Sequence, residues 1–145
     1  MTRKDTAALL QRARDAKERT AARALAEGRD REASERERLS TMEAWRDDYG
    51  ERQQALLRSG HASAADLGRW QQFLESLDAA IATQRSVVAG REAATEASRA
   101  RWQERRVDCA IAERFAERVH EEARRLQDRR EQAAVEDLCR GRRGR

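Results

Sequence analysis

Residues 67–81 read LGRWQQFLESLDAAI, and their apolar side chains at Leu67, Trp70, Leu74, Leu77 and Ile81 recur at alternating steps of three and four. The same steps continue through the C-terminal half of the chain. This ladder continues with Gln84, Val88, Arg91, Thr95, Ser98, Trp102, Arg105, Cys109, Ala112, Ala116, Val119, Ala123, Leu126, Arg130 and Ala133. Its mean spacing of about 3.5 residues is the heptad period, which keeps one seam of a helix facing a partner helix.

The composition favours a long helix. Charged residues make up 40% of the 145-residue chain, aromatic residues make up 4%, and proline is absent. This mixture with a heptad period is typical of coiled coils, and the balance of 31 basic against 27 acidic residues argues against disorder. At about 1.5 Å per residue, the second half of the chain predicts a helix about 110 Å long. We therefore expect an elongated protein without an enclosed cleft.

One break separates two helical patterns. Gly60 suits the left-handed position after a helix C-terminus, and Ser63 with Asp66 suits a helix N-cap. The sequence predicts a single domain over residues 1–145: a helix over about 5–58, a turn over 59–63, a helix over 64–139 and a disordered basic tail over 140–145. The expected fold is therefore all-α, a long antiparallel two-helix coiled-coil hairpin.

The first helix has a weaker seam. Its members are Leu39, Met42, Trp45, Tyr49, Gln53 and Leu56. A turn centred near residues 61–62 places residue i opposite residue 123 − i, which sets Tyr49 opposite Leu74 and Met42 opposite Ile81. Residues after about 118 would then have no partner within the chain, although the ladder continues there.

Several functional classes lack support. No apolar run approaches the roughly 18 residues that span a bilayer, and the N-terminus has no signal-peptide pattern, so we expect a cytoplasmic protein. There is no phosphate-binding loop, Cys-x-x-Cys pair or histidine metal pair, so we expect no enzyme activity, cofactor, metal or small-molecule substrate. Basic residues alternate with acidic ones except in the terminal cluster over 140–145, so we expect no nucleic-acid partner.

Aromatic residues gather near the turn. These are Trp45, Tyr49, Trp70 and Phe73. Beside the seam runs a second stripe, formed by Phe73, Leu77, Ala80, Gln84 and Val87. Because a two-helix hairpin buries only one narrow seam, this width is either an exposed contact surface or simply filling for the hairpin end.

Four stretches carry a family resemblance. They read LSTMEAWRDDY (39–49), RWQQFLESLDAAIATQR (69–85), ERFAER (113–118) and RREQAAVED (129–137). Together with Trp102, they resemble the FliJ family of flagellar export proteins over nearly the whole chain. The Gln-Phe-Leu and Ala-Ile blocks in the second stretch are not heptad requirements, so they distinguish this resemblance from a generic coiled coil.

The resemblance implies a hairpin similar to the central stalk of rotary ATPases. Family members bind the hexameric export ATPase, contact the export-gate membrane protein and escort export chaperones. The implied gate-docking residues are Arg38, Met42, Trp45, Tyr49, Phe73, Leu77, Ala80 and Gln84. The ATPase-ring contact is expected at the unpartnered ladder, Val119, Ala123, Leu126, Arg130 and Ala133.

We therefore expect a non-catalytic, stalk-like export component at the cytoplasmic side of the inner membrane, held there through the export apparatus. Two alternatives share this architecture. One is the equivalent stalk of a virulence type III secretion injector, and the other is a self-associating structural coiled coil.

Overall fold

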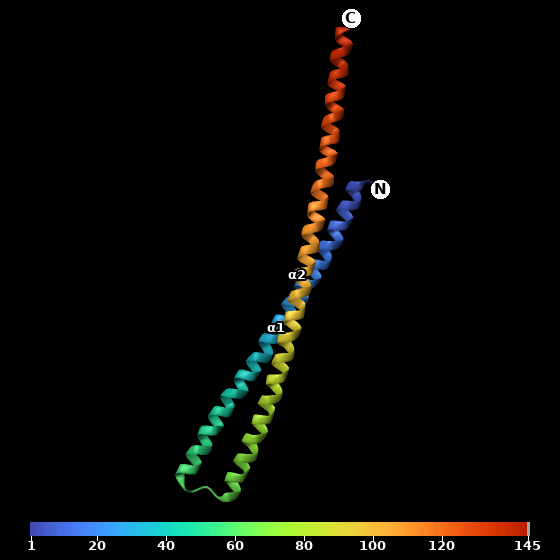
Figure 1. The fold of residues 1–145 in the computed structure, drawn as a ribbon. Helices are drawn as coiled ribbons and strands as arrows, with labels where there is room; N and C mark the ends of the chain where they lie inside the picture. The colour runs from blue at the N-terminus through green and yellow to red at the C-terminus, as the bar shows by residue number, and fades with distance from the viewer. Residues whose placement is uncertain (145) are drawn as a thin grey trace. The chain divides into compact units, whose positions relative to one another are not determined.

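The computed structural model describes residues 1–144 and contains two α-helices and no strand within them. Helix α1 spans Arg3–Ser59, helix α2 spans Ala64–Arg143, and a short turn joins them (Figure 1). The predicted all-α helical hairpin is confirmed.

Caps fix the start of each helix. The Thr2 hydroxyl accepts a hydrogen bond from the Asp5 backbone N–H at 3.2 Å, while the Thr2 N–H donates to the Asp5 carboxylate at 3.0 Å. The bonds that the Thr2 backbone N–H and hydroxyl both donate to the Asp5 carboxylate lower the pKa of Asp5. Ser63 Oγ accepts from the backbone N–H of Asp66 at 3.1 Å in the same way. Helix α1 therefore begins two residues earlier than predicted, because Thr2 is its N-cap.

Gly60 ends the first helix as predicted. Its φ of 70° is the only positive value among the described residues, and a side chain is strained in that conformation. Helix α2 has no comparable stop, so it continues to Arg143, four residues past the predicted end. The cations Arg140, Arg142 and Arg143 suit the negative end of a helix, and residues 140–143 are therefore helical. The predicted disorder of residue 145 lies outside the described residues.

The chain divides into two compact units. The tip unit consists of residues 23–100, and the terminal unit consists of residues 1–22 and 101–145. Ion pairs Arg46–Asp78 and Arg36–Glu92 show that α1 and α2 are antiparallel in the tip unit. Two further ion pairs, Arg14–Asp108 and Arg3–Glu122, show that the helices are also antiparallel in the terminal unit.

The ladder forms the core of both units. The tip unit buries Leu74, Ile81, Gln84, Val88 and Thr95, and the terminal unit buries Cys109, Ala112 and Val119. Every ladder residue from Leu67 to Ala123 is buried or half-buried, whereas the ladder residues from Leu126 onward are exposed. The buried part of the ladder thus stops beside the start of α1, where Arg3 bonds Glu122. Within the described residues, neither helix has an apolar stretch that could cross a bilayer.

Candidate functional site

Three aromatic rings form a cluster beside the turn in the tip unit. Tyr49 and Phe73 meet edge to face, with ring centroids 4.9 Å apart, and Trp70 lies 6.0 Å from Tyr49 and 6.4 Å from Phe73. The three rings line a hollow in the surface, and Arg69 borders it as well. These tilted and perpendicular geometries are the favourable ones for aromatic pairs, so the cluster stabilises the hairpin end. Phe73 nevertheless remains 45% exposed, and one ring of the cluster is available to a partner.

The α1 part of the predicted docking surface is a second hollow. It is lined by Arg38, Met42 and Trp45 together with polar residues of the same helix. Trp45 is 54% exposed, so its assignment to the α1 seam was wrong. Arg46 is half-buried instead and bonds Asp78 at 2.6 Å. The exposed indole therefore belongs to the surface of the tip unit and not to its core.

On α2, the predicted docking residues occupy one flank of the seam. Phe73 and Ala80 are exposed and seven residues apart, and Leu77 is half-buried between them. Val87 continues this spacing and is 37% exposed; the sequence analysis placed it on the second stripe but not among the gate-docking residues. The seven-residue interval was the signal that could have identified it.

Gln84 does not belong to the exposed surface. It is 8% exposed, and its amide Nε2 donates to the backbone oxygen of Glu35 at 3.0 Å and to the Glu35 carboxylate at 2.6 Å. The prediction that Gln84 docks a partner is therefore corrected, because its polar group is already satisfied inside the helix pair. Seven of the eight predicted gate-docking residues retain exposed or half-buried side chains.

The second candidate surface lies on α2 in the terminal unit. Val119 is 4% exposed because it packs within the pair of helices, so its predicted contact with an ATPase ring is corrected. Arg3 bonds Glu122 at 2.8 Å close to the start of α1, and α2 continues beyond it without a neighbouring helix (Figure 1). Ala123 is half-buried, and the remaining ladder members Leu126, Arg130 and Ala133 are exposed.

The thiols and acids do not assemble a reactive centre within residues 1–144. No group of three or more His, Cys, Asp or Glu side chains is placed there to hold a metal ion. Cys109 is buried. This burial is the main cause that raises the pKa of its thiol, and the nearby side chain of Asp15 is the second cause. A thiol kept protonated in this way is a poor nucleophile.

One comparison with known proteins finds a match, and it is to a family model. The family model described as flagellar FliJ protein matches residues 7–139, which include the turn and all but a few residues of each helix. No curated protein and no solved structure matches the chain.

Proposed function

The chain belongs to the FliJ family, which makes it a component of the flagellar type III export apparatus, and from this premise we propose that it serves as the central stalk of the hexameric export ATPase. The flagellar family favours this role over the stalk of a virulence injector. In this proposal the chain links the ATPase to the export gate and to export chaperones in the cytoplasm, at the inner membrane.

The observation that carries the proposal is the unpartnered end of α2. After Glu122 the heptad ladder continues, but the side chains of Leu126, Arg130 and Ala133 are exposed. A repeated apolar and basic seam on a single helix is suited to insertion between other protein surfaces. The pore of a ring of ATPase subunits is the partner proposed for it.

The gate-docking role is proposed for the tip unit. Without Gln84, the proposed gate-docking residues are Arg38, Met42, Trp45, Tyr49, Phe73, Leu77 and Ala80. Exposed Trp45 and Phe73 are large aromatic side chains of the kind that dominate binding at protein interfaces. Their location supports a role distinct from that of the terminal unit.

The test is hydrolysis by the cognate export ATPase. A ligand that binds the assembled ring better than the free subunit shifts the enzyme toward the ring. The chain should therefore raise the rate per subunit most at enzyme concentrations where the ring is mostly dissociated, and least where it is already assembled. An unchanged rate with stoichiometric chain at low enzyme concentration would contradict the stalk role.

A further inference from the structure

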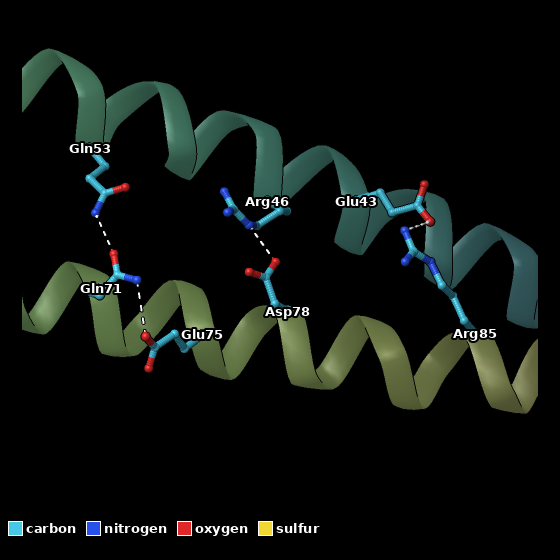
Figure 2. Close-up of polar contacts among 7 residues, drawn as sticks. All are labelled: Glu43, Arg46, Gln53, Gln71, Glu75, Asp78 and Arg85. Carbon is cyan, nitrogen blue, oxygen red and sulfur yellow. Dashed lines mark hydrogen bonds and ion pairs between the residues drawn. The ribbon is translucent and has the colours of Figure 1, made fainter.

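The two flanks of the helix pair in the tip unit differ in chemistry. On one side, here called the closed flank, ion pairs join the helices at seven-residue intervals of α2. Arg46 bonds Asp78 at 2.6 Å, Arg85 lies 3.6 Å from Glu43, and Arg36 bonds Glu92 at 2.5 Å. Figure 2 shows the first two of these bridges spanning the helices. Charge complementarity thus closes this flank.

The other side, here called the open flank, has no such complementarity. Its α2 residues follow the same seven-residue interval and are all apolar: Phe73, Ala80, Val87 and Ala94. Its α1 residues repeat at the same interval and are basic or aromatic: Arg31, Arg38, Trp45 and Arg52. The antiparallel register given by the ion pairs sets Arg38 near Val87 and Arg31 near Ala94, so these positions cannot bridge the helices.

Two arginines of the open flank, Arg31 and Arg38, and the adjoining ladder residue Arg91 are without acidic partners. Arg31, Arg38 and Arg91 form no ion pair within residues 1–144, whereas Arg52 lies 3.1 Å from Asp48. Arg31 and Arg91 border one hollow together with Ala94 and Ser98, and Arg91 is half-buried there. A partly buried guanidinium without an acid costs free energy, which an acidic group from outside would recover.

Acids of the same chain do not fill this role. Glu27 borders the hollow of Arg31 and Arg91, and Glu37 borders the hollow of Arg38, but neither makes an ion pair with these arginines. The open flank therefore combines an apolar row on one helix with free cations on the other. Its complement carries an apolar row beside acidic side chains.

We propose that the open flank of the tip unit binds an acidic amphipathic helix of a partner protein, which packs lengthwise against α1 and α2 as a third helix. This inference adds detail to the gate-docking surface and rests on the gate-docking role in the proposed function. It extends the surface away from the turn to Arg31, Val87, Arg91 and Ala94, and it specifies the chemistry of the partner.

A helix fits better than a lipid surface or a second copy. Rows repeating every seven residues on both sides of a groove match the rows of side chains on another helix. Two of the four side chains in the apolar row of α2, Ala80 and Ala94, are alanines, which offer little apolar area for insertion into a bilayer. A second copy offering the same flank would bring arginines against arginines, and like charges at close range are destabilising.

The test uses designed helical peptides of about 21 residues, three heptads, with leucine at the core positions. One peptide carries glutamate at the flanking positions and its matched control carries lysine. Fluorescence anisotropy with the full chain should detect binding of the acidic peptide and not of the lysine peptide. Binding should weaken as salt rises, because exposed charge pairs are screened. Equal affinity for both peptides, or no binding of the acidic peptide, would overturn the proposal.

Charge reversal locates the site. The double variant Arg31→Glu, Arg38→Glu should lower the affinity for the acidic peptide by at least about tenfold and should now bind the lysine peptide. The matched variant Arg23→Glu, Arg29→Glu has the same net charge but alters exposed positions off the open flank, so it should retain the original preference. Equal loss in both variants would mean nonspecific attraction and would overturn the proposal.

Vesicles containing phosphatidylglycerol complete the test. If they bind the chain in an Arg31- and Arg38-dependent manner and the acidic peptide does not bind, the flank is a membrane surface and the proposal fails. If the acidic peptide does not bind but the chain still binds the export gate, this inference fails and the proposed function stands. Loss of ATPase stimulation concerns the terminal unit and would contradict the stalk role instead.

Discussion

Gln84, which is buried, and Glu35, which is half-buried, form a polar contact in the middle of the tip unit. The Gln84 amide donates to the Glu35 backbone oxygen at 3.0 Å and to its carboxylate at 2.6 Å. A heptad seam of small and apolar residues can slide by one repeat at low cost, whereas a buried polar group must find its partner. This contact therefore fixes the register that sets Arg36 against Glu92 on the closed flank.

Gln84→Ala should lower the free energy of unfolding by about 2 kcal/mol, because the hydrogen bond to a charged carboxylate is lost. In a double-mutant cycle with Glu35→Ala, the coupling energy should be about 1 kcal/mol. It is smaller than the effect of Gln84→Ala because Glu35→Ala removes the carboxylate but keeps the backbone oxygen that Gln84 also bonds. Urea unfolding followed by circular dichroism measures all four proteins. Strictly additive effects would show that the carboxylate bond does not contribute.

Trp45→Ala and Phe73→Ala should each weaken binding to the cytosolic part of the export gate by at least about tenfold, as expected for aromatic hot spots. Both side chains are substantially exposed, so helicity should be retained. The matched control is Leu57→Ala, another exposed apolar side chain of the tip unit, which should leave the affinity unchanged. A large loss of helicity in either aromatic variant would instead assign that ring to the core.

Leu126→Glu should reduce stimulation of the export ATPase by about tenfold, because it places a carboxylate on the unpartnered seam. Val135→Glu makes a comparable change in the same part of α2, but Val135 is off the ladder. Both side chains are exposed, at 47% and 59%, so neither change should alter the helix. Steady-state hydrolysis compares the two, and equal behaviour would mean that the ladder does not select the contact.

The two cysteines should differ in reactivity. Cys139 is exposed, whereas Cys109 is buried and has a raised thiol pKa, so less of the reactive thiolate forms at neutral pH. Labelling of the native chain with a maleimide should modify Cys109 at least about tenfold more slowly than Cys139. Mass spectrometry of labelled peptides gives both rates, and urea should abolish the difference. Similar native rates would show that the terminal unit opens readily.

The ladder made the fold predictable. A heptad period is a local property of the chain, and one glycine between two such patterns places the turn. The same reasoning found the exposed stretch at Leu126, because a longer second helix outruns the first. It overestimated this stretch at Val119, which is buried because the pairing of the two helices extends as far as Arg3 and Glu122.

The candidate surface was less predictable. The next seam residue on a helix can lie either three or four positions after the last one. Between Met42 and Tyr49, both Trp45 and Arg46 satisfy this spacing. The side chain that takes the seam depends on the opposing helix, where Asp78 bonds Arg46 and leaves the indole outside. Gln84 was misassigned for a related reason, since its partner Glu35 is 49 residues away in sequence.

The sequence by itself determined the helices, the turn and the antiparallel pairing, because periodicity and capping act along the chain. Only the tertiary structure decided which flank of the tip unit is closed by ion pairs and which retains Arg31 and Arg38 without acids. That distinction depends on the register between two helices, and register is a property of side chains meeting across space.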